Sequence, residues 1–256
     1  MSVIETELSE GVFTVTLSDM SNRNTLSARL TSELVSALDD ADSNPDVRVV
    51  VLTNKGRVFC AGADLSERSS SKDSETGSKP VDPLEIFSRF RKSPKPYIGK
   101  IAGHCVAGGM GLAAAMDISI ATEEAKFGFT EVRIGVAPAI ISVLCLPKMR
   151  PAEASEVFLR GNRFSASEAA RLGLINAAVP ADELDSAVDA VISDIKAGGP
   201  EAISAAKQLT VQVPHMDIDE AFRWTAKLSS ELFKGPEAQE GMRSYLEKKS
   251  PSWIKE

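Results

Sequence analysis

Alternating hydrophobic and polar residues open the chain in two segments within residues 3–18, on either side of Ser9, Glu10 and Gly11. A period of two is typical of strands with one buried face, and a short polar break that contains glycine is typical of a hairpin. The pattern therefore predicts a β-hairpin at the start of the chain.

The next segment, residues 26–46, changes to a helical period. Ser27 is placed to cap the start of a helix, and Pro45 lies beyond its end. Four apolar residues recur at intervals of three or four and would share one face: Leu30, Leu34, Leu38 and Ala41. This spacing predicts an amphipathic helix whose apolar face packs on the core.

Three nearly continuous apolar runs follow, at residues 47–53, 96–103 and 117–122. Such runs are typical of strands that are buried on both faces of a sheet. Helical segments separate them, which favours a mostly parallel α/β arrangement with crossover connections. Beyond these runs the pattern becomes helical, apart from one short strand at residues 175–180. The helices predicted there are residues 165–174, 181–198, 201–213, 217–233 and 236–249.

Residues 66–83, between the first two core strands, are rich in serine, charged residues, proline and glycine. This composition is typical of a mobile surface loop. A loop that becomes ordered over a bound ligand is the alternative, and the pattern leaves both open.

Length and charge narrow the classes of function. A chain of 256 residues predicts one domain, or one domain with a small appendage. The net charge is −7 and the lysines and arginines are scattered, so we expect no nucleic-acid partner. The first residues lack the basic and apolar segments of a secretion signal, and no apolar run is long enough to span a membrane. We therefore expect a cytoplasmic protein with no membrane partner.

The cysteines and histidines suggest no chemistry of their own. Cys60, Cys105 and Cys145 are odd in number, far apart and surrounded by small or apolar residues, which predicts buried free thiols. The two histidines are too far apart for a metal-binding HxH or HExxH spacing, so no metal site is predicted. We expect His104 to be a buried, hydrogen-bonded histidine, although it could line a pocket.

Two stretches of small residues, "VFCAGADL" (58–65) and "AGGMGL" (107–112), each follow a predicted core strand. Ligands of open α/β sheets bind beyond the carboxyl ends of the strands, so both stretches should meet in one crevice. Their spacing fits no phosphate-binding loop, but glycine and alanine leave main-chain N–H groups accessible. Two such groups directed at one oxygen form an oxyanion hole. The alternative is that these small residues only allow close helix packing.

Four motifs together resemble the enoyl-CoA hydratase/isomerase (crotonase) family, in order and spacing, from about residue 3 to the C-terminus. They are "VRVVVLTNKGRVFCAGADL", "IAGHCVAGGMGLAAAMDISIAT", "AKFGFTEVRIGVAP" and "EGMRSYLEKKSPSW". The resemblance implies an α/β fold with a crotonase-like (ClpP/crotonase) core of repeated ββα units in residues 1–195. It also implies a C-terminal helical segment, residues 196–256, used in oligomerisation as a homotrimer or a hexamer made of two trimers.

The resemblance also assigns the oxyanion hole to the N–H groups of Ala63 and Gly108. The carbonyl of Ala61 matches a position that accepts a hydrogen bond from the adenine amino group of coenzyme A. Arg23 matches a basic position near the phosphates of coenzyme A. An exposed arginine without a ligand is the alternative for that residue.

Three further matches are with substrate-binding positions. Asp64 and Leu65 follow the predicted hole, and the expected role of Asp64 is to cap or hold the turn. Lys248 matches a lysine that in relatives can reach the ligand of a neighbouring subunit. The substrate implied is an acyl thioester of coenzyme A, and no separate cofactor is expected.

Glu131 matches one of the family's two catalytic glutamates, whereas Gly111 stands where the other would be. A carboxylate desolvated in an apolar pocket gains basicity, and a thioester held by an oxyanion hole becomes acidic at its α-carbon. The missing acid puts two-glutamate hydration in doubt. The glycine could instead make room for a branched acyl group.

Three functions remain open. One base is enough to move a double bond, which favours an isomerase, while hydration needs both an activated water and a delivered proton. The "GGxGL" and "TEVRIGVAPAIIS" segments, however, also resemble bacterial hydratases of branched, carboxylated enoyl-CoAs such as methylglutaconyl-CoA. We therefore place enoyl-CoA hydratase first and double-bond isomerase second. A non-catalytic acyl-CoA-binding protein is the third possibility, and the presence of Glu131 argues against it.

Overall fold

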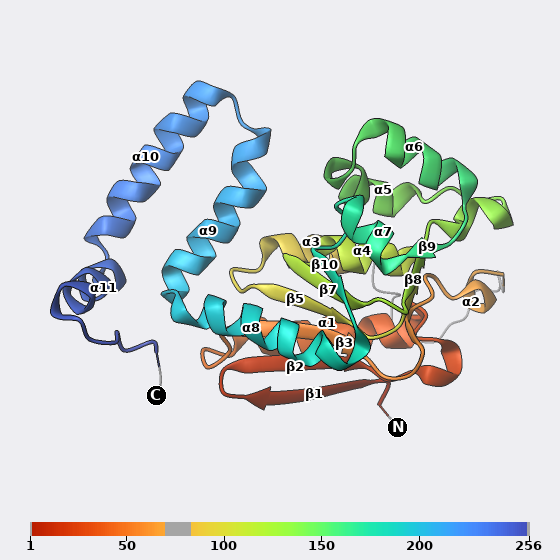
Figure 1. Ribbon diagram of the computed structural model, residues 1–256, viewed down its shortest axis with the longest axis horizontal. Helices are drawn as coiled ribbons and strands as arrows, with labels where there is room; N and C mark the ends of the chain where they lie inside the picture. Colours follow the sequence, from red (N-terminus) through yellow and green to blue (C-terminus); the bar gives the residue numbers. More distant parts are fainter. Residues whose placement is uncertain (1, 70–82, 255–256) are drawn as a thin grey trace.

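A computed structural model describes residues 2–69 and 83–254, and shows an α/β body from which a helical arm extends to one side (Figure 1). We use "arm" for the last three helices: α9 (Pro200–Gln212), α10 (Ile218–Lys234) and α11 (Pro236–Glu247). Most of the predicted surface loop falls on residues 70–82, which lie outside the described residues.

The predicted hairpin and first helix are confirmed. Strands β1 (Ile4–Ser9) and β2 (Val12–Leu17) pair antiparallel, as alternation around a glycine-containing break predicts. Helix α1 (Ala28–Ser43) begins after Ser27, whose hydroxyl accepts a hydrogen bond from the Leu30 N–H at 3.2 Å. The four apolar residues predicted to share one face of α1 are all buried.

The main sheet has the strand order β1-β2-β3-β5-β7-β10. Every pairing after the hairpin is parallel, as the crossover pattern predicts. Its central strands are the three apolar runs, and the short C-terminal strand is its edge: β3 (Val49–Asn54), β5 (Tyr97–Ile101), β7 (Ile118–Thr122) and β10 (Ala177–Val179).

Both faces of this sheet are covered, which explains why its central strands are apolar throughout. Val50 and Leu52 of β3 face the larger core, which also contains the apolar face of α1. Val49 and Val51 face the opposite way and pack with residues of α8 (Leu184–Ala197). The alternation along β3 thus distributes its side chains between two cores.

A second, smaller sheet was not predicted from the residue pattern. Its strand order is β4-β6-β8-β9, from β4 (Val58–Cys60), β6 (His104–Val106), β8 (Lys126–Gly128) and β9 (Phe164–Ser165). Each central strand of the main sheet is followed by one of these short strands and then by helical segments. This recurrence forms the ββα units that the family resemblance implies.

The remaining helices of the body are short. They are α2 (Leu65–Ser69), α3 (Pro83–Lys92), α4 (Gly108–Ala115), α5 (Ala139–Cys145), α6 (Pro151–Arg160) and α7 (Ala166–Arg171). The five helices predicted in the C-terminal half are confirmed as α7 to α11. In the described part of the chain no helix is both long and apolar enough to cross a membrane.

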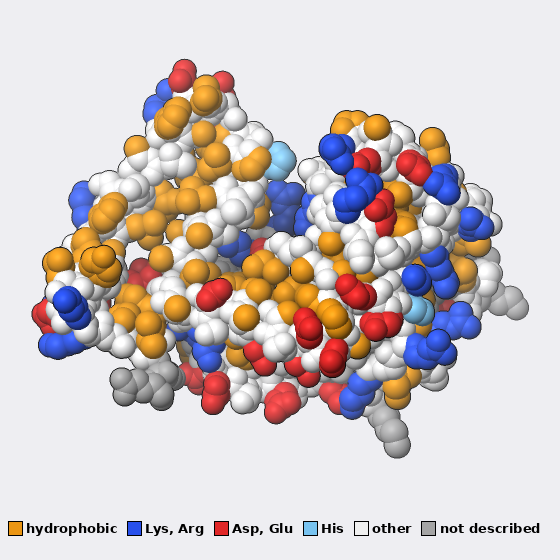
Figure 2. All heavy atoms as spheres, viewed as in Figure 1, with side chains coloured by type: hydrophobic (Ala, Val, Ile, Leu, Met, Phe, Trp, Pro, Cys, Tyr) orange, Lys and Arg blue, Asp and Glu red, His pale blue; other side chains and the backbone are white. Residues whose placement is uncertain are grey.

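The arm differs from the body in burial. No residue of α10 or α11 is buried, although the structure describes both helices in full. Large apolar side chains on them face solvent, among them Phe222, 69% exposed, and Leu246, 80% exposed. Figure 2 shows hydrophobic atoms along the surface of the arm. The predicted domain boundary at residue 195 falls in the last turn of α8, and the division of the chain there stays a prediction.

Candidate active site

The two small-residue stretches lie in contact at the end of the second sheet. Leu26 forms an isolated parallel bridge with Ala63, and its N–H donates to the Gly62 carbonyl at 2.7 Å. A Cβ on Gly62 would lie 2.9 Å from the nitrogen of Gly108, and a Cβ on Gly108 would lie 3.6 Å from the nitrogen of Ala63. Only glycine at position 62 allows this approach, and its φ of +87° also favours glycine.

Among the described residues, the N–H groups of Ala63 and Gly108 are both without a hydrogen-bond acceptor. Gly108 is the first residue of α4, where a main-chain N–H has no acceptor within the helix. Neither N–H donates a hydrogen bond to any group in the part of the chain that the structure describes. Two free donors therefore lie next to each other, as an oxyanion hole requires. That they bind one oxygen stays a prediction.

Ala107, which precedes the helix, has a strained backbone with φ 50° and ψ −126°. Non-glycine residues rarely adopt a positive φ, and such strain gathers at functional sites. The Ala107 N–H donates to the Gly128 carbonyl at 2.9 Å, which fixes the turn to β8. The turn holds Gly108 against Gly62.

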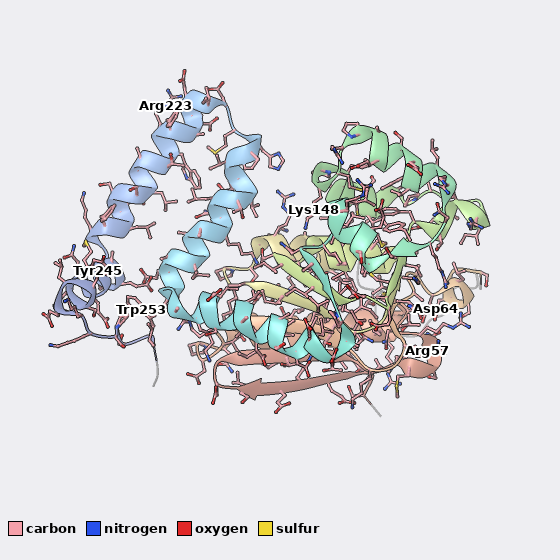
Figure 3. The ribbon with its side chains drawn as sticks, in the orientation of Figure 1. Arg57, Asp64, Lys148, Arg223, Tyr245 and Trp253 are labelled. Atoms are coloured by element: carbon pink, nitrogen blue, oxygen red, sulfur yellow. The ribbon has the colours of Figure 1, made fainter. Side chains whose placement is uncertain are left out.

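Asp64 holds the loop that carries Ala63. One carboxylate oxygen accepts from the Ser66 N–H at 2.9 Å and caps α2, and the other accepts from the Asn22 side-chain amide at 2.8 Å. These bonds, with that from the Ser66 hydroxyl the strongest, lower the pKa of Asp64 to about 2. The geometry agrees with the expected role in holding the turn. Figure 3 shows Asp64 beside α2, at the opposite end of the molecule from Tyr245 of the arm.

The structure brings three further predicted substrate-binding residues near Asp64. Ala61 lies half-buried between β4 and Gly62. Leu65 is the first residue of α2 and is 56% exposed. Arg23 is exposed and follows Asn22, which contacts Asp64, so its side chain is available to a ligand at this edge.

Lys248 is not brought to this group. It ends α11 on the arm, far from α2 and the second sheet (Figure 1). Within one chain it cannot contact a ligand at Ala63. Its predicted contact with a neighbouring subunit's ligand remains a prediction.

Glu131 lies in a 3-10 turn, Thr130–Ile134, that follows β8. Val106 of β6 is the register partner of Gly128 of β8, so the segments leading to Gly108 and Glu131 leave the second sheet at the same edge. The Oε2 atom of Glu131 is buried and has no hydrogen-bond partner among the described residues. Desolvation by burial raises the pKa of this carboxyl above its usual value. A carboxylate in this state is a stronger base than one in water.

Gly111 is enclosed by neighbours on two other helices. A Cβ there would lie 2.5 Å from Cγ2 of Ile141 on α5, and 2.9 and 3.0 Å from two ring atoms of Phe87 on α3. A second acid at this position would require α3 or α5 to shift. The space is filled, so the interpretation that this glycine makes room for a branched acyl group is not supported. Phe87 and Ile141 were missed from the sequence because each lies more than twenty positions from Gly111.

The other reactive side chains are accounted for structurally. The Nδ1 atom of His104 accepts from the Lys126 N–H at 3.2 Å, and burial together with nearby cations lowers the pKa of His104. The prediction of buried free thiols is confirmed, and burial raises the pKa of Cys60 and of Cys145 to about 12. No group of three or more potential metal-ligating side chains gathers within the described ranges.

Comparison with known proteins agrees with this architecture. The family model described as enoyl-CoA hydratase/isomerase matches residues 7–256. Enoyl-CoA hydratase EchA19 of Mycobacterium tuberculosis is 32% identical over 246 residues, which cover 93% of this chain and 91% of that protein.

Two further proteins extend the comparison. A peroxisomal Delta(3,5)-Delta(2,4)-dienoyl-CoA isomerase of Arabidopsis thaliana is 29% identical over 269 residues, which cover all of this chain and 97% of that protein. A crystal structure from Legionella pneumophila, described as an enoyl-CoA hydratase/isomerase (crotonase), matches with a TM-score of 0.90 and 32% identity. The match covers 99% of this chain and 100% of that one. The crotonase-like α/β fold is thereby confirmed.

Proposed function

Because the chain belongs to the enoyl-CoA hydratase/isomerase family, we propose that it is an enoyl-CoA hydratase, which adds water to the double bond of a 2-enoyl thioester of coenzyme A. The observation that carries this proposal is the buried, unpaired carboxylate oxygen of Glu131 at the edge where two free N–H groups lie side by side. A base next to an oxyanion hole is suited to proton transfer at a carbon beside a thioester.

In the proposed reaction the thioester oxygen accepts hydrogen bonds from the N–H groups of Ala63 and Gly108. Negative charge develops on this oxygen when a nucleophile adds at C3. Each fixed donor is worth about 3 to 4 kcal/mol in such a transition state. Both donors belong to the main chain, in the segments that follow β4 and β6, so they need little reorganisation during the reaction.

Glu131 supplies the proton chemistry. Its carboxylate removes a proton from water while the water oxygen bonds to C3, and the electrons of the double bond move to form the enolate. The protonated carboxyl then returns that proton to C2. One carboxylate thus performs both steps, because no acid is available at Gly111.

The remaining predicted residues would bind the coenzyme A portion of the substrate. The Ala61 carbonyl would accept from the adenine amino group, Arg23 would contact a phosphate, and Leu65 would pack against the ligand. Asp64 would keep this edge in place. Coenzyme A enters as part of the substrate, and the proposal needs no other cofactor.

A specific observation favours a second function, double-bond isomerisation. The enclosure of Gly111 leaves one carboxylate, and one carboxylate is enough to carry a proton between C4 and C2. In that reaction the same oxyanion hole would stabilise the dienolate, and no water would be activated.

Turnover in water enriched in ¹⁸O separates these functions. The purified protein is incubated with a panel of 2-enoyl-CoA and 3-enoyl-CoA thioesters, and the products are analysed by mass spectrometry. A hydratase yields a product heavier by one labelled water. A product of unchanged mass with a moved double bond would replace our proposal with isomerisation. Tight binding without turnover of any thioester would identify an acyl-CoA-binding protein.

We also propose that the chain assembles as a homotrimer or as a dimer of trimers through the arm. Its support is the exposed apolar side chains of α10 and α11, which a monomer would leave in water. Light scattering measures the mass directly. A stable monomer at micromolar concentration would contradict this assembly.

A further inference from the structure

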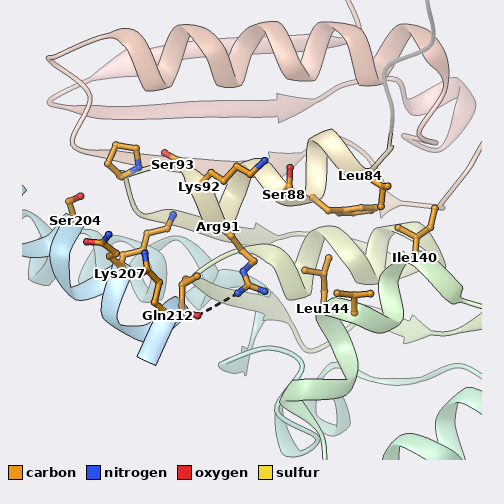
Figure 4. A pocket seen from close by; sticks show the side chains of 15 residues that line it. Leu84, Ser88, Arg91, Lys92, Ser93, Ile140, Leu144, Ser204, Lys207 and Gln212 are labelled. Atoms are coloured by element: carbon orange, nitrogen blue, oxygen red, sulfur yellow. Dashed lines mark hydrogen bonds between the residues drawn. The ribbon is translucent and has the colours of Figure 1, made fainter. Parts of the chain in front are cut away.

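A cavity of about 750 Å³ lies between α3, α5 and α9 (Figure 4). Its volume is in the range of small-molecule binding sites. Three of the described side chains that line it are cationic, Arg91, Lys92 and Lys207, and none of them is a carboxylate. The chain as a whole has a net charge of −7. A cavity lined by cations in an acidic protein favours an anionic ligand.

Lys207 is already neutralised within the protein. Its ammonium group pairs with the Asp117 carboxylate at 2.8 Å and donates to the Lys95 carbonyl at 2.7 Å. It also lies over the ring of Tyr97, 5.0 Å from the centroid. These contacts satisfy the ammonium group, so Lys207 forms part of the cavity wall but adds no free charge to it.

Arg91 and Lys92 keep their charges available to a ligand. The guanidinium of Arg91 has five N–H donors, and its hydrogen bond to the Val211 carbonyl, at 3.5 Å, is longer than usual. The ammonium group of Lys92 has no hydrogen bond or ion pair with any described residue. Both side chains line the same cavity, so one carboxylate in it would accept charge-assisted hydrogen bonds from both.

One side of α9 adds neutral donors to the cavity. Ser204, Gln208 and Gln212 are spaced by four residues and therefore share a face of the helix, and all three line the cavity. Within the described ranges their side chains have no hydrogen-bond partner. Two free cations flanked by a hydroxyl and two amides suit a ligand with a single negative charge better than a polyanion such as coenzyme A.

The wall formed by α3 and α5 is apolar and includes Phe87, Ile140, Val143 and Leu144. Val143 is 66% exposed and Ile140 is 41% exposed. A small inorganic anion would leave this wall in water, and an uncharged hydrocarbon would leave the two cations without a counter-ion. A ligand with a carboxylate and a hydrocarbon body satisfies both sides of the cavity.

We infer that this cavity binds a carboxylate with a hydrocarbon body, such as a medium-chain fatty acid. The carboxylate lies against Arg91 and Lys92, and the hydrocarbon lies against the apolar wall of α3 and α5. This ligand site is additional to the proposed reaction centre, because Ala63, Gly108 and Glu131 do not line the cavity. The inference goes beyond the proposed function and does not depend on it.

The test measures the binding of octanoate to the full-length protein by calorimetry. Octan-1-ol carries a similar hydrocarbon without the charge, and acetate carries the charge without the hydrocarbon. The variants are Arg91→Met and Lys92→Met, which keep a long apolar side chain and remove the cation. Arg223→Met is the matched control, because Arg223 lies on α10 of the arm and does not line the cavity (Figure 3).

We expect one octanoate to bind per chain, with octan-1-ol and acetate at least about tenfold weaker. Arg91→Met and Lys92→Met should each weaken octanoate by about tenfold, since each removes a hydrogen bond to a charged group. Neither variant should change the affinity for octan-1-ol, and Arg223→Met should bind octanoate as the wild type does. If Arg91→Met disturbs α9 through its bond to Val211, Lys92→Met still provides the test.

Photolabelling locates the bound chain. An octanoate analogue with a diazirine at its far end should form adducts on α3, α5 or α9. Adducts confined to the segments around Ala63 and Glu131, or an octanoate affinity that both variants leave unchanged, would overturn the inference. No binding of octanoate would overturn it as well, and is the result expected if a second copy of the chain fills the cavity. All of these readouts are independent of turnover, so failure of the hydratase proposal would not affect them.

Discussion

The body and the arm use their apolar residues in opposite ways. In the body, strands and helices bury them in two cores on the faces of one sheet. In the arm, α10 and α11 bury none, and side chains such as Phe222 and Tyr245 face solvent. The free donors, the desolvated carboxylate and the enclosed glycine all belong to the body. This difference indicates that the chemistry depends on the body's packing, whereas the arm provides surface for other contacts.

Polar contacts link the arm and the segments that flank it to the body. Lys207 of α9, which is buried, forms an ion pair with the partly exposed Asp117, which precedes β7. Arg48 of the body donates to the Gly198 carbonyl, just before α9, at 2.7 Å, and to the Trp253 carbonyl, after α11, at 3.2 Å. The comparison therefore separates two kinds of substitution, those that alter chemistry in the body and those that alter the attachment of the arm.

The largest expected effect is that of Glu131→Gln. Glutamine keeps the shape of the side chain but removes the base, and position 111 supplies no acid to replace it. Turnover should fall by about 10² to 10⁴-fold with little change in ligand affinity, as is typical of general acid–base catalysis. Steady-state kinetics and calorimetry measure the two quantities. Glu156→Gln on exposed α6 is the control, and near wild-type turnover by Glu131→Gln would reject Glu131 as the base.

The dependence of turnover and stability on pH sharpens the same assignment. Burial raises the pKa of Glu131 above 4.5, so kcat/KM should fall tenfold per unit as pH decreases below that raised pKa. The change of stability with pH has the opposite sign to the change of kcat/KM, because the folded state binds this proton more tightly than the unfolded state does. The free energy of unfolding contributed by Glu131 falls as pH rises from 4.5 through the raised pKa. Thermal unfolding should therefore show Glu131→Gln to be more stable than wild type at neutral pH but not below pH 4.5. If the two proteins were equally stable at neutral pH, the desolvation of Glu131 would be contradicted.

Much of the body could be predicted from the residue pattern because its signals are local. The hairpin follows from alternation over six residues a strand, and α1 follows from its apolar spacing and the cap at Ser27. The second sheet could not be predicted this way, since its strands have two or three residues and too few positions to show a period. Only the family resemblance, which implies repeated ββα units, indicated these strands.

The site was predictable only in part, for a similar reason. Glu131 and the small-residue stretches stand in recognisable motifs. The enclosure of Gly111 depends on Phe87 and Ile141, and the anchoring of Asp64 depends on Asn22, and these pairs meet only in the folded chain. The ion pair of Lys207 had only a weak signal in the sequence, namely a charged residue among the alanines and leucine of α9.

Lys207→Met tests the attachment of the arm. It leaves the Asp117 carboxylate, 26% exposed, without its Lys207 partner, and removing one member of a partly buried ion pair is destabilising. Because Asp117 keeps some contact with water and accepts from the Tyr97 N–H, we expect a loss of about 2 to 3 kcal/mol. Denaturant unfolding measures the loss, and hydrogen exchange should show reduced protection in α9. The double variant Lys207→Met/Asp117→Asn should recover part of it, and a neutral single variant would mean that the pair does not hold the arm.

A pair of glycine substitutions compares the packing of the two regions directly. In the body, the Cβ that Gly111→Ala adds would lie 2.5 Å from Ile141. The cost of this overpacking, about 1 to 3 kcal/mol, exceeds the gain in helix propensity of about 1 kcal/mol. Gly241→Ala in the arm meets only the outer ring of Trp253 at 3.1 Å and should keep most of that gain. Denaturant unfolding should show Gly111→Ala destabilised by about 1 kcal/mol and Gly241→Ala neutral or stabilised. The reverse order would contradict the tight enclosure of Gly111, which also predicts that Gly111→Glu does not raise hydratase activity.

The smallest effect is expected at Ala107, where the body stores strain to place a donor. Glycine would relieve a positive φ of 50°, a gain of about 1 to 3 kcal/mol. It would lose the methyl group that packs against Gly62, at a cost of about 0.8 kcal/mol. The greater flexibility of glycine in the unfolded chain would lower the free energy of unfolding by a further 0.5 to 1 kcal/mol or so. These terms nearly cancel, so Ala107→Gly should change the free energy of unfolding by less than about 1 kcal/mol. Ala107→Val should destabilise by more, because a β-branched residue at this φ is a genuine outlier. Equal stability of the two variants in denaturant unfolding would show that the turn does not hold Gly108 as described.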